Sequence, residues 1–426
     1  MVIVFVLVGL LALAAVAGLY WYVWRRLVRD TTSGPGLARR AGTVVFVAGP
    51  VLMIAAVAAE RAGAPFWLQR VLAWPGFLWM ALSIYLLLGA VAGEVVRPLL
   101  RRVVERRAAP SAAVPNPAPV PQTESVPRTE SVPTGAAPQE PPPAEPPRPV
   151  TTPSRRLFVA RAVGGAAAAV ALGTVGYGTY GVLRGPRVKR VTVPLARLPR
   201  SAHGYRIAVV SDIHLGPTLG RDFCQRVVDT INSMQPDLIA VVGDLVDGSV
   251  KDLGPAAAPL ARLRARHGSY FVTGNHEYYS GAAQWVREVR ELGLHPLENA
   301  RTEMAGFDLA GVNDVAGESE GHGPDFERAL GDRDTARAVV LLAHQPVQIH
   351  DAVKHGVDLQ LSGHTHGGQL WPGNYIAELA NPTVAGLERY GDTQLYVSRG
   401  AGAWGPPTRV GAPSDITVVE LASLRA

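Results

Sequence analysis

The sequence has 426 residues, is 48% hydrophobic, and carries a formal net charge of +6 with a single cysteine. One cysteine excludes an intrachain disulfide framework. The positive charge does not indicate nucleic-acid binding, because residues 188–426 hold about 22 basic and 27 acidic residues, a balance near −5, against 19 and 8 before them. The basic excess therefore flanks the apolar segments of the first part, and we expect no nucleic-acid partner.

Three apolar segments within residues 1–107 are long enough to cross a bilayer. They cover about residues 2–23, 41–59 and 71–96, and arginines follow the first and the third. A buried core helix is the alternative for such a segment, and lengths near 20 residues argue against it. Cleavage of the first segment as a signal peptide is not expected, because no basic residues precede the apolar run. We therefore predict three transmembrane helices.

Residues 108–153 are rich in proline, alanine, glutamate and threonine, and Thr-Glu-Ser-Val-Pro occurs at 123–127 and again at 129–133. Such a composition cannot bury a core. We predict a disordered tether that is locally extended as polyproline II rather than a domain.

Residues 154–187 begin with Ser154-Arg155-Arg156-Leu157-Phe158, which a mildly apolar stretch rich in glycine and alanine follows. This resembles a twin-arginine export signal, placed internally. The resemblance implies a twin-arginine export machinery as partner, and a retained membrane anchor is expected because no convincing cleavage site follows. An ordinary fourth transmembrane helix is the alternative.

The basic flanks predict the topology of this multi-pass protein. Lysine and arginine favour the cytoplasmic side, which places the 25–40 loop and the 97–107 segment inside and residues 188–426 outside. Residues 188–426 are thus expected on the extracytoplasmic face of the cell membrane. One conflict stands, since Arg184, Arg187, Lys189 and Arg190 would then lie outside. Long folded domains translocate largely regardless of such charge.

Residues 188–426 suffice for one substantial domain. Within them, five polar clusters each follow a short apolar run that is typical of a buried strand. The runs are Ile207–Val210, Leu238–Val242, Tyr270–Val272, Val339–Leu342 and Leu359–Leu361. The chemistry-bearing members of the clusters are Asp212, His214, Asp244, Asp247, Asn275, His276, His344, His364 and His366. We expect them on loops at strand ends, where ligands gather in α/β sheets.

These residue types suit hard or borderline divalent cations. Carboxylate and imidazole ligands fit manganese, iron or zinc, and the lack of thiolates argues against a structural cysteine-rich zinc site. Two metals about 3.5–4 Å apart need a shared anion and open positions for water and a phosphoryl oxygen. The clusters hold enough ligands for that arrangement, whereas any one His or Asp alone would more often be an ordinary surface or core residue.

The set resembles the calcineurin-like metallophosphoesterase superfamily, whose pattern is D-x-H, G-D-x-x-D, G-N-H-[DE], H and G-H-x-H. The resemblance covers roughly residues 188–426 and implies a four-layer α/β/β/α sandwich. It assigns Asp212, His214 and His366 to a first metal. It assigns Asn275, His344 and His364 to a second metal, with Asp244 bridging both.

The resemblance further implies that His276 is the general acid or electrostatic stabiliser. A metal-bridging hydroxide would attack phosphorus in line. Asp247 is expected to orient a ligand, or else to cap a turn. The segments after His364 and around Arg399 look like a membrane-associated bacterial phosphodiesterase branch of the superfamily. Arg399 would clamp a phosphate, unless it is an ordinary surface ion-pair member.

The same branch signatures include Trp371 and Trp404, which with Tyr390 would form an apolar rim for a lipid or a sugar, although packing is the commoner fate of such residues. We thus predict a membrane-anchored phosphoesterase that needs two divalent metals and acts on a phosphoester, with an envelope lipid or lipid-linked sugar phosphate as candidate substrate. The alternative is an inert, membrane-tethered scaffold that retained the fold. A helix is expected over 221–234 and another over 282–292, with closing strands near 395–398 and 416–421.

Overall fold

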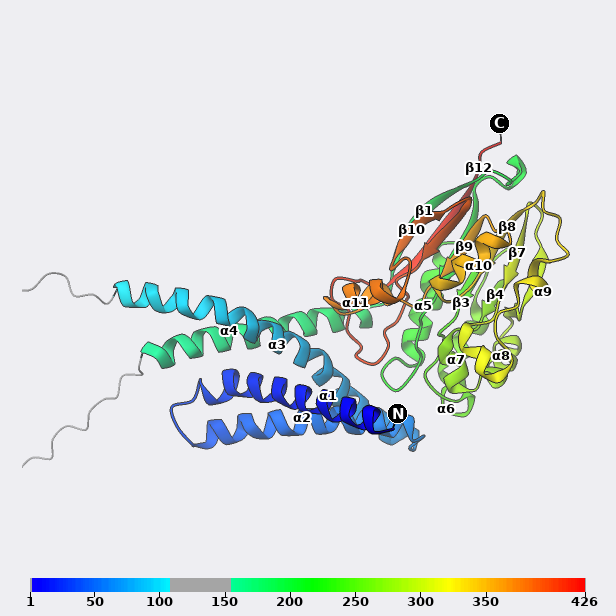
Figure 1. The fold of residues 1–426 in the computed structure, drawn as a ribbon. Helices are drawn as coiled ribbons and strands as arrows, with labels where there is room; N and C mark the ends of the chain where they lie inside the picture. Colours follow the sequence, from blue (N-terminus) through cyan, green and yellow to red (C-terminus); the bar gives the residue numbers. More distant parts are fainter. Residues whose placement is uncertain (1, 108–154, 426) are drawn as a thin grey trace, which may run out of the picture.

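A computed structural model describes residues 2–107 and 155–425, and it shows a helical bundle joined to an α/β domain (Figure 1). The predicted proline-rich tether, and Ser154 of the arginine motif, lie outside the described residues. The four long helices are α1 (Val2–Trp24), α2 (Leu37–Arg61), α3 (Phe66–Arg107) and α4 (Arg155–Leu183). By length and composition all four can cross a membrane.

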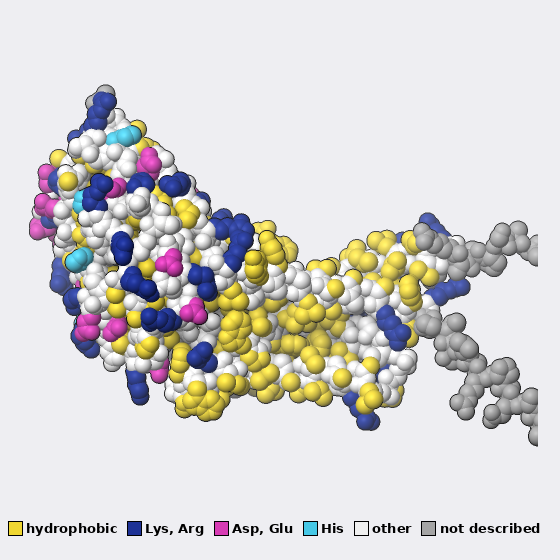
Figure 2. Space-filling view, turned by 180° about the vertical axis from the view of Figure 1, so that it is seen from behind, with side chains coloured by type: hydrophobic (Ala, Val, Ile, Leu, Met, Phe, Trp, Pro, Cys, Tyr) yellow, Lys and Arg dark blue, Asp and Glu magenta, His cyan; other side chains and the backbone are white. Residues whose placement is uncertain are grey.

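The bundle is apolar on its outside, as a lipid-facing surface requires. Figure 2 shows hydrophobic side chains over most of its length and Lys and Arg gathered at the end far from the α/β domain. The α1–α2 turn, the end of α3 and the start of α4 all lie at that far end (Figure 1). The α/β domain follows α4 directly at the opposite end, as β1 (Arg187–Leu195).

Two six-stranded sheets form the centre of the α/β domain. The first has the order β1, β12 (Asp415–Ser423), β2 (Tyr205–Val210), β3 (Leu238–Val242), β4 (Ser269–Val272) and β5 (His295–Pro296). The second has the order β10 (Gly386–Tyr390), β11 (Thr393–Val397), β9 (Leu359–Ser362), β8 (Ala338–Leu342), β7 (Phe307–Gly311) and β6 (Ala300–Glu303).

Helices cover the outer face of each sheet, which completes the predicted four layers. The first sheet carries α5 (Arg221–Ser233), α6 (Val250–Ala257), α7 (Asn275–Ser280) and α8 (Ala282–Glu291) on its side of the domain. On the side of the second sheet are the short helices α9 (Phe326–Leu330) and α10 (Ile349–Lys354), while α11 (Gly373–Ala380) lies toward the bundle. The helices expected over 221–234 and 282–292 correspond to α5 and α8.

The burial of strand β3 on both faces explains why its sequence is a continuous apolar run. Ile239 and Val241 face the core under the helices, whereas Leu238, Ala240 and Val242 face the core between the two sheets. A strand covered on both faces needs apolar side chains at every position. Each fully buried aliphatic side chain contributes about 1.5–3 kcal/mol, so the two cores hold this strand firmly.

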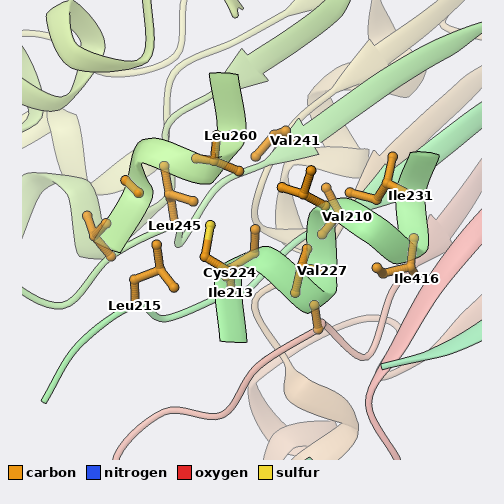
Figure 3. Packing of buried hydrophobic residues seen from close by; sticks show 14 of the residues in the cluster. Val210, Ile213, Leu215, Cys224, Val227, Ile231, Val241, Leu245, Leu260 and Ile416 are labelled. Atoms are coloured by element: carbon orange, nitrogen blue, oxygen red, sulfur yellow. The ribbon is translucent and has the colours of Figure 1, made fainter. Parts of the chain in front are cut away.

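In helix α5 the buried apolar residues recur at the spacing of a helix. Phe223, Val227 and Ile231 recur every four residues and are buried, and Cys224 lies beside them. Figure 3 shows Cys224 among aliphatic side chains from neighbouring strands and loops. Burial raises the pKa of the Cys224 thiol to about 12. The cysteine is therefore a core residue without reactive thiolate character.

Candidate metal centre

Five loops at the carboxyl ends of strands carry the predicted site residues to one place. Asp212 follows β2, Asp244 follows β3, Asn275 follows β4, His344 follows β8 and His364 follows β9. The pairs β2–β3, β3–β4 and β8–β9 are parallel, so their carboxyl ends lie at one edge of each sheet. The polar clusters thus lie on strand-end loops, as the apolar runs before them predict.

One group of side chains consists of Asp212, His214 and His366, whose nearest ligand atoms all lie within 4.8 Å of one another. His214 Nε2 and His366 Nε2 are 3.0 Å apart, and His366 Nε2 is 3.3 Å from Asp212 Oδ1. The backbone N–H of His364 donates to Asp212 Oδ1 at 3.0 Å, which orients the carboxylate. These are the residues that the family pattern assigns to a first metal.

The second group consists of Asp244, His344 and His364. His344 Nε2 lies 3.0 Å from Asp244 Oδ2, and Asn275 Oδ1 lies 3.0 Å from His364 Nδ1. The same Asp244 Oδ2 is 3.8 Å from His214 Nε2 in the first group. The Asp244 carboxylate therefore stands between the two groups, where a bridging ligand would have to be.

The chemistry of the second group calls for a cation. His344 Nδ1 donates to the Val242 carbonyl at 2.8 Å, which leaves a lone pair on Nε2. That buried Nε2 atom has no well-directed hydrogen bond among the described residues, although Asp244 Oδ2 lies only 3.0 Å away. A buried carboxylate this close to an imidazole nitrogen needs a positive charge between the two, either a proton on the imidazole or a metal ion.

The closeness of Asp244 and His344 also shifts the pKa values of both side chains. Although burial lowers it, the Asp244 carboxylate raises the pKa of His344 well above its ordinary value. Although burial opposes it, the neighbouring histidines hold the pKa of Asp244 well below its usual range. The carboxylate and the imidazole thus attract a positive charge, a proton or a metal cation, to the space between them. A donor set of carboxylate, imidazole and amide oxygen fits manganese, iron or zinc.

Asp247 connects the first group with His276. Its Oδ1 atom is 2.9 Å from His214 Nδ1 and 2.7 Å from His276 Nδ1. His214, Asp247 and His276 also meet the geometric criterion for a metal-holding group. Their nitrogen atoms already face the carboxylate, so the contacts are those of an orienting side chain. The nearby helix cap is Ser249 and not Asp247.

His276 lies outside the two groups that contain Asp212 and Asp244, and it contacts Asp247. Burial lowers its pKa, but the hydrogen bond to Asp247 and the charges of Asp247 and Asp244 outweigh this and raise it to about 9. The imidazole is therefore protonated at neutral pH. Trp404 and Tyr279 lie with their rings 5.7 and 5.4 Å from the His276 ring, and both are exposed.

Two buried charged residues support the centre although no site role was predicted for them. The Glu277 carboxylate accepts the backbone N–H groups of Asp244 at 3.0 Å and of Leu245 at 2.8 Å. The Arg409 guanidinium donates to the His366 carbonyl at 3.0 Å and to the Gly402 carbonyl at 2.6 Å. Glu277 is visible as the last residue of the G-N-H-E block, whereas Arg409 lies far along the chain and carries no sequence signal.

The loop backbone is strained where it presents the ligands. The non-glycine residues with positive φ include five of the predicted ligands, with φ between 49° and 72°: Asp212, His214, Asp244, His364 and His366. Such conformations cost about 1–3 kcal/mol each and persist where surrounding structure imposes them. Gly363 and Gly402 allow the close approach: a Cβ at Gly363 would collide with Asp212, and one at Gly402 with the Ile213 carbonyl.

The remaining predicted residues occupy different places. The aliphatic part of Arg399 lies against Gly367, and its guanidinium has no hydrogen bond or ion pair in the part of the chain that the structure describes. Of the three predicted rim aromatics, only Trp404 lies beside His276. The Tyr390 hydroxyl is bonded to the Pro382 carbonyl, and the Trp371 carbonyl accepts from Tyr85 of α3.

The helical bundle also reaches the centre. Glu60, in the last turn of α2, interacts electrostatically with Asp247 and His276. Phe66, the first residue of α3, packs against the core under α5. The end of the bundle therefore contacts the α/β domain through Phe66 and carries a charge, on Glu60, that acts on the centre.

Comparison with known proteins places these features in a family. A family model described as calcineurin-like phosphoesterase matches residues 205–368. A "transmembrane protein with metallophosphoesterase domain" of Danio rerio is 39% identical over 259 residues, which are 58% of this chain and 59% of that protein. An uncharacterized metallophosphoesterase of Helicobacter pylori strain J99 is 37% identical and covers 59% of this chain and 68% of that protein.

A further relative is an uncharacterized metallophosphoesterase of Aquifex aeolicus, which is 36% identical and matches 55% of this chain and 91% of its own length. The matches to the transmembrane relatives from Danio rerio and Bos taurus span 59% and 56% of their lengths. The matched part is thus most of the Aquifex aeolicus protein but little more than half of the two vertebrate proteins.

Proposed function

This chain belongs to the calcineurin-like phosphoesterase family, and from that premise we propose that it is a membrane-anchored phosphodiesterase that requires two divalent metal ions. The observation that carries the proposal is that the group of Asp212, His214 and His366 lies beside the group of Asp244, His344 and His364, with the Asp244 carboxylate close to both. Asp212, His214 and His366 would hold one cation, and Asn275, His344 and His364 the other, with Asp244 shared. Manganese, iron and zinc all suit this donor set.

When bound, the cations would polarise the phosphoester and activate water for attack on phosphorus. The protein's own residues supply the rest. His276, protonated and oriented by Asp247, would donate a proton to the leaving oxygen. Arg399, whose guanidinium lacks an internal partner among the described residues, would bind the phosphate oxygens. Glu277 and Arg409 hold the loops in place through backbone hydrogen bonds.

A metal-loading and turnover experiment tests the proposal. The full chain in detergent is incubated with manganese, and hydrolysis of an aryl phosphodiester and bound metal are measured together. Asp244→Ala should abolish most hydrolysis and lower metal stoichiometry, because the shared carboxylate is lost. Asp392→Ala, at an exposed position, is the matched control and should behave as wild type. Equally slow hydrolysis by wild type and Asp244→Ala would favour the inert scaffold instead.

We also propose that the catalytic domain lies on the extracytoplasmic side and meets phosphoesters of the envelope, such as lipid-linked sugar phosphates. The support is the gathering of Lys and Arg at the opposite end of the bundle, the end that favours the cytoplasm (Figure 2). The Arg155-Arg156 pair at the start of α4 would serve as a twin-arginine signal. A screen of phosphomonoesters, aryl phosphodiesters and extracted envelope lipids tests the substrate class.

A further inference from the structure

Helix α11 has an apolar face that none of the described residues covers. None of its residues is buried. The exposed fractions are 58% for Tyr375, 71% for Ile376 and 87% for Leu379. These positions, one and four residues apart, lie on one face of a helix, and Trp371 just before the helix is 49% exposed. Apolar groups of this size clustered on a surface mark a partner site.

The position of α11 identifies what faces it. The Tyr85 hydroxyl of α3 donates to the Trp371 carbonyl at 3.0 Å, and the hydroxyls of Thr179 in α4 and Thr408 are 2.6 Å apart. Leu370 and Val410 pack against a bundle core that includes Tyr85 and Val175. Figure 1 shows α11 beside the end of α4, where the bundle meets the α/β domain. The segment 370–410 therefore rests on helices within their candidate membrane spans.

The charges nearby fit the same surface. Arg184, Arg187 and Arg190 follow the end of α4 and are exposed. Basic side chains at the edge of an apolar face are typical of helices that lie in a lipid interface, because they attract anionic headgroups. In the topology predicted from the basic flanks, these arginines lie on the extracytoplasmic side, against the usual preference of basic residues. A surface that lies in the lipid interface gives these arginines a role on that side.

We propose that α11 and Trp371 insert into the leaflet of the bilayer next to the catalytic domain, so that the metal centre opens at the level of the lipid headgroups. The metal centre and α11 are close along the chain, since His366 precedes Trp371 by five residues. The Gln369 side chain, between them, donates to the Trp404 carbonyl at 2.8 Å, and Trp404 borders His276. A phosphoester headgroup would then reach the centre laterally from the bilayer.

The location of α11 can be measured without any substrate. The full chain is labelled with a nitroxide at Ile376→Cys and placed in nanodiscs of phosphatidylcholine and phosphatidylglycerol. The one native cysteine, Cys224, is buried and does not compete for the label. Collisions of the label with oxygen, which concentrates in lipid, are compared with collisions with chromium oxalate, which stays in water.

Two reference sites calibrate the measurement. Val170→Cys labels an exposed position of α4 within its candidate span, and Glu291→Cys labels an exposed position at the end of α8. The Ile376 label should resemble the Val170 label, with high oxygen and low chromium oxalate collision. Chromium oxalate collision as frequent as at Glu291 would overturn the proposal, and so would shielding from both reagents, which would indicate a protein partner. Leu379→Cys repeats the test at a second position.

The outcome does not depend on catalysis. A lipid-like result with an inactive protein would leave the insertion standing and remove the proposed hydrolysis, whereas an active protein with a water-exposed label would do the reverse.

Discussion

Asp247 links two functions through one carboxylate, since it contacts both His214 and His276. Asp247→Asn preserves the shape but removes the charge that keeps His276 protonated. We expect kcat/KM for an aryl phosphodiester to fall about 10- to 100-fold, the usual cost of losing an orienting partner of a ligand. Metal content, measured alongside, should fall less than it does in Asp244→Ala. Asp392→Asn is the matched control, and full activity of Asp247→Asn would return this residue to a purely local role.

His276 is expected to act on the leaving group and not on the metals. His276→Ala should lower kcat by about 10²–10⁴-fold, the range for loss of proton donation. Both metals should stay bound, as measured by elemental analysis of the purified chain. His350→Ala, at an exposed histidine of α10, should change neither quantity. Loss of one metal equivalent in His276→Ala would instead assign His276 to the ligand set.

At the scale of elements, the centre depends on how closely the loops after β2 and β9 approach each other. A side chain at Gly363 would collide with Ser211 and with the Asp212 carboxylate. The backbone of residue 363 does not have a positive φ, so its conformation does not require glycine. Glycine is required at this position because the neighbouring loop leaves no room for a side chain. The two strands belong to different sheets, so this contact is where the halves of the sandwich are joined at the site.

Gly363→Ala should therefore displace Asp212 and weaken metal binding. Overpacking of this kind costs about 1–3 kcal/mol, so the thermal midpoint should fall by several degrees. Calorimetry with and without added manganese measures both effects, and the stabilisation by metal should shrink. Gly254→Ala is the control, because Gly254 is inside α6 and has only ordinary contacts around a Cβ. An unchanged midpoint and unchanged metal affinity in Gly363→Ala would show that the loops can adjust.

For the whole molecule, the question is how the α/β domain reaches its side of the membrane. The proposed metal set draws seven ligands from five distant loops, so it can be filled only after folding. A folded domain needs an export route for folded cargo, which is what the Arg155-Arg156 pair would provide. Arg155→Lys combined with Arg156→Lys keeps the charge and removes the guanidinium groups.

Protease added to intact spheroplasts should digest the domain in wild type and spare it in the double lysine variant. Arg101→Lys with Arg102→Lys, at the basic end of α3, is the matched control and should be digested like wild type. Equal digestion in all three would identify α4 as an ordinary insertion signal. Protection of the wild-type domain would place the catalytic domain in the cytoplasm.

Local sequence patterns by themselves indicated the buried strands, two helices and the polar clusters of the candidate metal centre. Continuous apolar runs such as Leu238–Val242 predicted buried strands because both faces of those strands are covered. The helices over 221–234 and 282–292 followed from apolar spacing and were found as α5 and α8. The polar clusters after the strands indicated a metal centre because unpaired carboxylate and imidazole groups are seldom gathered at strand ends without a ligand. Local patterns carry this information because strand and helix periodicities are set by nearest neighbours along the chain.

Only the tertiary structure decided which distant groups meet. Arg409 donates to the His366 carbonyl, and Glu60 at the end of a bundle helix interacts electrostatically with Asp247. The exposed face of α11 was likewise not predicted, and it is the structure that leaves Tyr375, Ile376 and Leu379 exposed beside the bundle. Contacts between residues far apart in the chain depend on the packing of whole elements, and no local pattern in the sequence encodes that packing.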